Sequence, residues 1–154
     1  MRSRVSLSPA AIGIVSDDVA LRRSLSILLS LEGHQVLAGN TEDAPLLAAQ
    51  VEARLEDNPG QRCCLLIDDR RSRGGTGLDL AEALARRGAL LPVVLLADTL
   101  DAKARARAEA AHVAVLLEKP AVGEAIVLGV ARALERPTPA MAANDSARPR
   151  AAAR

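Results

Sequence analysis

Five short apolar runs, each followed by a longer segment with helical periodicity, constrain the fold of this 154-residue chain most strongly. The runs are continuous rather than alternating, which is typical of strands that are buried on both faces. The predicted strands span residues 10–15, 34–38, 63–67, 92–96 and 113–117. The predicted helices span residues 19–31, 41–55, 78–87, 101–111 and 122–134. This order predicts an α/β fold, with helices on both faces of one parallel five-stranded sheet.

Composition excludes several classes of function. The chain has no Phe, Tyr or Trp, so its core must be built from Leu, Val, Ile and Ala. The total charge is +1, and residues 136–154 contribute four Arg and one Asp, so the rest of the chain is slightly acidic. It therefore has no basic footprint for nucleic acid. No apolar run is long enough to span a membrane, and no secretory signal is visible. The adjacent Cys63 and Cys64 are predicted as buried thiols of a reducing cytoplasm.

The sequence divides into three parts. Residues 1–9 form an N-terminal extension, residues 10–135 form one domain, and residues 136–154 are rich in Pro, Ala and Arg. We expect this last part to be a disordered tail, because it has no apolar periodicity. The predicted helix at residues 101–111 has only alanines as its apolar face. It should be held loosely, since alanine buries little area.

Acidic residues follow the predicted strands at their carboxyl ends, which share one edge in a parallel sheet. Asp17 and Asp18 follow the first strand, Asp68 and Asp69 follow the third, and Lys119 comes two residues after the fifth. Such carboxylates repel one another, and a bound Mg²⁺ would relieve that repulsion. The group has the chemistry to accept and release a phosphoryl group on an aspartate. One Asp pair alone is more often a helix cap or a turn, and either Asp17 or Asp18 can cap the first helix.

These motifs resemble the receiver domain of bacterial two-component response regulators, over residues 10–135. The Asp17-Asp18 pair before a leucine-rich helix is similar to the acidic pocket of that family, and IDDRRSRGGTGLDL (residues 67–80) is similar to its phosphoacceptor loop. The segment LLEKP (residues 116–120) is the most specific match. The resemblance implies a flavodoxin-like (βα)5 fold, which is a doubly wound parallel five-stranded sheet with strand order 2-1-3-4-5.

The resemblance also implies roles for individual residues. Asp68 would be the phosphoacceptor and Lys119 the family lysine, with Mg²⁺ held by Asp17 and Asp68 and assisted by Asp18. A shorter form of the loop would instead make Asp69 the phosphoacceptor. We prefer Asp68, because it directly follows the apolar strand.

The chain departs from the family pattern at several positions. Ser16 stands at the first acidic position, Ala97 replaces the hydroxyl residue of the fourth strand, and Thr99 lies two residues further on. Leu116 replaces an aromatic residue. A hydrophobic residue and a proline usually follow the phosphoacceptor, and Arg71 and Ser72 stand there instead.

Our leading hypothesis is a single-domain receiver that takes a phosphoryl group from a histidine kinase or a histidine phosphotransfer protein. The tail is too short and polar for a DNA-binding output domain, so we expect signalling by contact with a downstream protein. A homodimer is among the assemblies that the sequence allows.

The second hypothesis is a pseudo-receiver that binds partners without phosphorylation. A small Mg²⁺-dependent phosphohydrolase ranks below both, because it would need a second acid where Arg70 stands. We therefore expect that the chain is not an enzyme. A solvated loop is the preferred interpretation of Arg70, Arg71 and Arg73, over a site that attracts a phosphodonor.

Overall fold

The computed structural model describes residues 9–70, 75–89 and 91–135. The predicted N-terminal extension up to residue 8 and the predicted tail lie outside the described residues, as do Arg71, Ser72 and Arg73. Within the described parts, no helix combines the length and the apolar character needed to cross a bilayer.

The five predicted strands form one sheet in the order β2-β1-β3-β4-β5, and all neighbouring strands are parallel. The strands are β1 (Ala11–Val15), β2 (Gln35–Gly39), β3 (Cys63–Asp69), β4 (Val93–Ala97) and β5 (Val115–Glu118). The central strands β1, β3 and β4 are almost entirely buried, as their continuous apolar sequences predict. The flavodoxin-like fold and its strand order are therefore confirmed.

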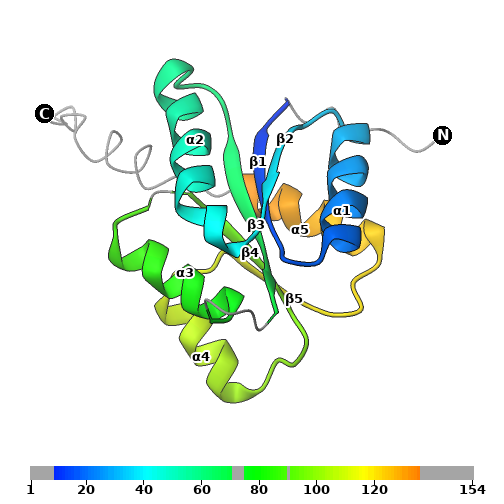
Figure 1. The fold of residues 1–154 in the computed structure, drawn as a ribbon, viewed down its shortest axis with the longest axis vertical. Helices are drawn as coiled ribbons and strands as arrows, with labels where there is room; N and C mark the ends of the chain where they lie inside the picture. The colour runs from blue at the N-terminus through cyan, green and yellow to red at the C-terminus, as the bar shows by residue number, and fades with distance from the viewer. Residues whose placement is uncertain (1–8, 71–74, 90, 136–154) are drawn as a thin grey trace, which may run out of the picture.

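The helices cover both faces of this sheet (Figure 1). They are α1 (Val19–Leu31), α2 (Ala44–Asp57), α3 (Gly77–Arg86), α4 (Ala102–Ala110) and α5 (Gly123–Glu135). Leu25 of α1 and Val130 of α5 pack with Ile14 of β1 in one core cluster. Val51 of α2 and Leu84 of α3 belong to the cluster on the opposite face, which also includes residues of α4. The sheet is thus doubly wound.

The boundaries of three elements, α2, β3 and β5, differ by two or more residues from those that the sequence pattern predicts. Strand β3 continues to Asp69, so Asp68 and Asp69 belong to the strand rather than follow it. The predicted helix at residues 41–55 is a 3-10 turn, η1 (Thr41–Asp43), followed by α2. Pro45 lies in the first turn of α2, where its missing N–H leaves no intrahelical bond unmade. Strand β5 begins at Val115 rather than Val113, because a turn with a positive φ of 57° at His112 precedes it.

Strand alternation sends the two aspartates of β3 to opposite faces of the sheet. Leu66 belongs to the cluster under α1 and α5, whereas Ile67 belongs to the cluster under α2, α3 and α4. Because successive side chains alternate, Asp68 follows Leu66 and Asp69 follows Ile67. The end of β3 therefore presents one carboxylate to each side.

Gly77 allows the start of α3 to lie directly against the end of β3. A Cβ atom at this position would lie 2.6 Å from the carbonyl oxygen of Asp68 and 2.8 Å from Cα of Asp69. Both contacts are with backbone, so a side chain could be accommodated only by moving α3 or β3. The Thr76 hydroxyl and the Asp79 carboxylate close a capping box around this first turn.

Candidate functional site

Asp68 lies at the carboxyl end of the central strand β3 and is only 5% exposed. Its two carboxylate oxygens have different partners. The Ser16 hydroxyl donates a hydrogen bond to Oδ2 at 2.9 Å, and the Lys119 ammonium forms an ion pair with Oδ1. A buried carboxylate needs such partners, because desolvation disfavours its charged form. The structure therefore brings together two of the predicted site residues, Asp68 and Lys119.

Lys119 is held in place by the backbone that follows β5. Its N–H donates to the Ala97 carbonyl at 2.8 Å, which ties the residue to the end of the neighbouring β4. The peptide bond between Lys119 and Pro120 is cis. The ammonium also lies 3.6 Å from Oδ1 of the exposed Asp98, so it contacts carboxylates from β3 and from the loop after β4.

Ser16 has a role that the sequence did not reveal. Besides donating to Asp68, its Oγ accepts a hydrogen bond from the Asp18 N–H at 3.1 Å. Its carbonyl accepts from Nη1 of Arg22 at 2.7 Å, so α1 fixes the turn after β1. The serine is buried and supplies a neutral hydroxyl to the phosphoacceptor candidate. Its position directly after the first apolar strand was the available signal.

Asp69 points away from this cluster. Its Oδ1 accepts a hydrogen bond from the Leu78 N–H at 2.9 Å, in the first turn of α3. This placement agrees with the strand alternation described above. Asp69 therefore braces the helix that follows the loop, whereas Asp68 meets Lys119.

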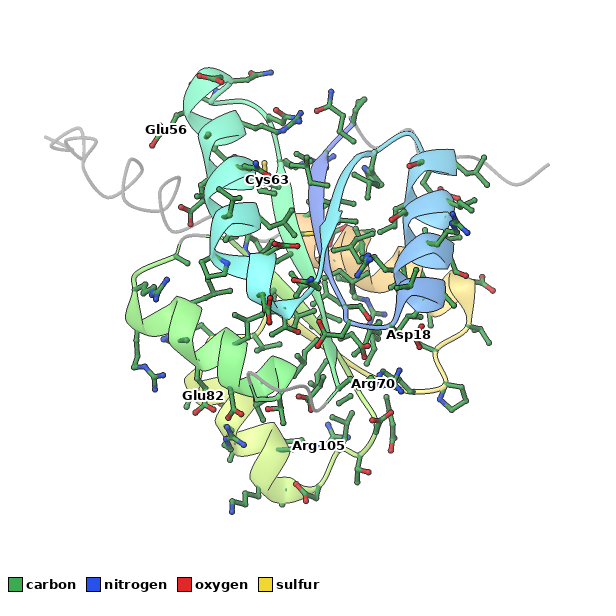
Figure 2. The ribbon with its side chains drawn as sticks, in the orientation of Figure 1. Asp18, Glu56, Cys63, Arg70, Glu82 and Arg105 are labelled. Carbon is green, nitrogen blue, oxygen red and sulfur yellow. The ribbon has the colours of Figure 1, made fainter. Side chains whose placement is uncertain are left out.

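The two acidic residues after β1 also separate. Asp18 is the N-cap of α1 and accepts from the Leu21 N–H at 3.1 Å, as expected for one of the pair. Its Oδ2 lies 3.0 Å from Nη1 of Arg70 (Figure 2). The Leu21 N–H, and after it the Arg70 guanidinium, lower the pKa of Asp18. Asp17 is exposed, and its Oδ1 accepts from the Thr41 N–H at 2.8 Å.

The arrangement of these side chains is not that of a ready metal site. Among the described residues, no group of three or more His, Cys, Asp and Glu side chains is placed to hold a metal ion. Asp68 is paired with Lys119, Asp18 with Arg70, and Asp17 with a backbone N–H. The donor types suit Mg²⁺, but the arrangement does not fit it as it stands. The assignment of Asp17, Asp18 and Asp68 as metal ligands stays a prediction.

Three of the positions at which the chain departs from the receiver pattern, Ala97, Thr99 and Leu116, lie in β4, in the loop after it and in β5. Ala97 is buried at the end of β4, and its methyl side chain offers no hydrogen bond to a phosphoryl oxygen. Leu116 is half-buried in β5 and packs against the cluster on the α2–α4 face. Thr99 is exposed in the loop after β4.

Comparison with known proteins gives a consistent picture. The chain is 33% identical over 123 residues to the transcriptional regulatory protein FixJ of Azorhizobium caulinodans, a match that covers 80% of this chain and 54% of FixJ. The chain thus spans about half the length of this curated relative. No protein-family model matches the chain.

Solved structures share the fold at lower sequence identity. The crystal structure of FixJ-N superposes with a TM-score of 0.63 and 22% identity, covering 86% of this chain and 98% of that one. The non-phosphorylated HemR receiver domain of Leptospira biflexa gives 0.64 and 22%, covering 84% and 98%. The chemotaxis protein CheY4 of Vibrio cholerae gives 0.63 and 17%, covering 82% and 100%. The sequence match to FixJ and the fold shared with these structures support a receiver domain of the response-regulator type over the described part of this chain.

Proposed function

We propose that this receiver domain accepts a phosphoryl group on Asp68 from a histidine kinase or a histidine phosphotransfer protein. The observation that carries the proposal is the pairing of a buried aspartate, at the end of the central strand, with the ammonium of Lys119. Of the two adjacent aspartates, Asp68 has this lysine as a partner, whereas Asp69 is bonded to the first turn of α3. Asp68 is therefore our phosphoacceptor and Lys119 our candidate for its catalytic partner.

In the proposed transfer, a carboxylate oxygen of Asp68 attacks the phosphorus of a phosphohistidine. The new bond is P–O and the broken bond is P–N, so the imidazole leaves with the electron pair and takes up a proton. The product is an acyl phosphate with more negative charge than the free carboxylate. Lys119 would stabilise that charge through a charge-assisted hydrogen bond. Mg²⁺ stays our expected cofactor from the receiver resemblance.

We infer a signalling module of the cytoplasm rather than an enzyme. A phosphohydrolase with an aspartate nucleophile would need a second acid at position 70, and Arg70 there is instead paired with Asp18. Output would then pass through contact with a downstream protein, or with a second copy of the domain.

Intact mass after incubation with acetyl phosphate and MgCl₂ tests this proposal. The wild-type protein should gain the mass of one phosphoryl group, and alkaline hydroxylamine should remove it, because an acyl phosphate is labile to that nucleophile. No mass gain from acetyl phosphate, or from a phosphorylated histidine donor protein, would contradict it.

A pseudo-receiver is the second candidate, and Ala97 is the observation that favours it. This residue is 1% exposed and has no hydroxyl with which to hold a phosphoryl oxygen at the end of β4. Ala97→Thr distinguishes the two candidates. In a working receiver it should strengthen any conformational change that follows phosphorylation, measured as the number and size of backbone NMR shifts. In a pseudo-receiver the spectra with and without the phosphodonor should stay identical in both proteins.

A further inference from the structure

Arg70 lies two residues after Asp68 and reaches across to the turn after β1. Its Nη1 lies 3.0 Å from Oδ2 of Asp18, and the two side chains come from separate loops that the sheet brings together (Figure 2). Both side chains are partly exposed, at 57% for Arg70 and 34% for Asp18. The loop after β3 thus places a positive charge on an acidic residue that the receiver resemblance assigns to metal binding.

The chain itself supplies the positive charge that the acidic edge needs. Lys119 forms an ion pair with Asp68 and lies near Asp98, and Arg70 forms an ion pair with Asp18. Clustered aspartates predict a divalent cation because like charges in one place repel. Here that repulsion is already reduced by two side-chain cations.

We propose that Arg70 is an intramolecular competitor of the divalent cation, which can reach Asp18 only by displacing the guanidinium. The proposal deepens the proposed function and rests on the same site. An exposed ion pair of this kind changes an equilibrium constant by only about two- to fivefold. The guanidinium therefore weakens metal binding without preventing it.

The consequence is a receiver whose site is filled by metal only at higher concentrations of the free cation. Because the Arg70–Asp18 pair is exposed, added salt also weakens it. Substitution of Arg70 would change the affinity for the metal without changing the phosphoacceptor Asp68. Metal binding and phosphorylation can therefore be separated by experiment.

A Mg²⁺ titration followed by backbone NMR of the full chain, without any phosphodonor, tests the competition. The chain has no Trp or Tyr, so fluorescence is not a suitable readout. Arg70→Gln should lower the apparent Kd for Mg²⁺ by about two- to fivefold, read from the amide shifts of Ser16, Asp18 and Asp68. Arg70→Lys keeps the charge and should stay closer to wild type.

Two comparisons separate competition at Asp18 from a general effect of charge. Arg105→Gln removes the same charge from an exposed position on α4 and should leave the Kd unchanged. In an Asp18→Asn background, Arg70→Gln should have little further effect, because the competed carboxylate is gone.

The proposal is overturned if Arg70→Gln leaves the Kd unchanged or raises it. It is also overturned if Arg70→Gln increases the Mg²⁺ affinity as much in the Asp18→Asn background as in the wild type. A third contradicting result is that neither the wild type nor Arg70→Gln shows any Mg²⁺-dependent shift. If the wild-type chain takes up no phosphate but Arg70→Gln binds Mg²⁺ more tightly than wild type, only the phosphoryl-acceptor function is refuted.

Discussion

The ammonium of Lys119 contacts the carboxylate of Asp68 although their strands, β5 and β3, are separated by β4. Asp68 is the second-last residue of β3 and Lys119 directly follows the last residue of β5, so both lie at the carboxyl edge of the sheet. The side chain of Asp68 is 1% exposed and that of Lys119 is 21% exposed. The IDD and LLEKP segments, about fifty residues apart in the sequence, thus form one structural unit.

Loss of Lys119 should cost stability as well as function. In Lys119→Met, the buried Asp68 side chain loses its ammonium partner, so we expect a loss of about 1–3 kcal/mol in the free energy of unfolding. Urea denaturation followed by circular dichroism measures it. Lys103→Met, at an exposed position of α4, is the matched control and should change the free energy by less than about 0.5 kcal/mol. Equal values for the two variants would contradict the pairing. Adding Asp68→Asn to Lys119→Met should recover part of the loss.

Gly77→Ala should destabilise the domain because of contact with backbone atoms. The added methyl would lie 2.6 Å from the Asp68 carbonyl oxygen, and neither β3 nor α3 can move away without breaking other contacts. We expect a loss of about 1–3 kcal/mol, measured by urea denaturation. Gly60→Ala is the control, since the nearest atom to its added methyl is Asn58 Oδ1 at 3.9 Å. If Gly77→Ala is as stable as Gly60→Ala, the approach of α3 to β3 is looser than described.

His34 should make stability depend on pH. Its Nδ1 accepts a hydrogen bond from the Ala10 N–H at 3.2 Å, so the ring is neutral in the folded state. Burial lowers the pKa of His34, and Arg62 lowers it further, while Glu32 opposes the shift. Above about pH 6.5 the ring is neutral in both states and this contribution is complete. As the pH falls below that value, the unfolded chain binds the proton first, so stability decreases until the lowered pKa is passed.

The variant His34→Asn tests this dependence, because its side-chain oxygen can accept the same hydrogen bond and does not titrate. The free energy of unfolding is measured at steps of about half a pH unit from about pH 7.5 down to about pH 5. As the pH falls, it should decrease less steeply in His34→Asn than in wild type. His112→Asn, at an exposed position, should keep the wild-type slope. Identical slopes for all three proteins would contradict the assignment.

α4 should be the least protected helix in hydrogen exchange. Ala108 is its only buried residue, so little apolar area holds it. Its main polar attachment is Arg107, which forms ion pairs with Asp79 at 2.8 Å and with Glu82, both on α3. Arg107→Gln should lower the opening free energy of α4 by about 0.5 kcal/mol, whereas Arg105→Gln should not. Protection of α4 equal to that of α5 would contradict this prediction.

The fold could be predicted because its signals are local. Continuous apolar runs indicated the buried strands, and the pattern located every helix to within a few residues. Two of the boundaries that differ depend on single residues: Pro45 sets where α2 begins, and the turn at His112 delays the start of β5. Strand alternation, also a local rule, accounts for the placement of Asp68 and Asp69 on opposite sides of the sheet.

The partners of the site residues could not be predicted in the same way. The pattern indicated which carboxylates share an edge, but not that Ser16 donates to Asp68 or that Arg70 pairs with Asp18. These contacts depend on how two loops cross in space, and the sequence had favoured a solvated Arg70. The prediction of a metal site treated the carboxylates as uncompensated, whereas neighbouring cations compensate two of them.

The most direct test of the central claim is the intact mass of two isosteric variants after incubation with acetyl phosphate and MgCl₂. Asp68→Asn removes the carboxylate that contacts Lys119, and Asp69→Asn changes only the one bonded to Leu78. The account predicts that Asp68→Asn gains no phosphoryl group and that Asp69→Asn gains most of the wild-type amount. Phosphorylation of Asp68→Asn together with loss of phosphorylation in Asp69→Asn would contradict it.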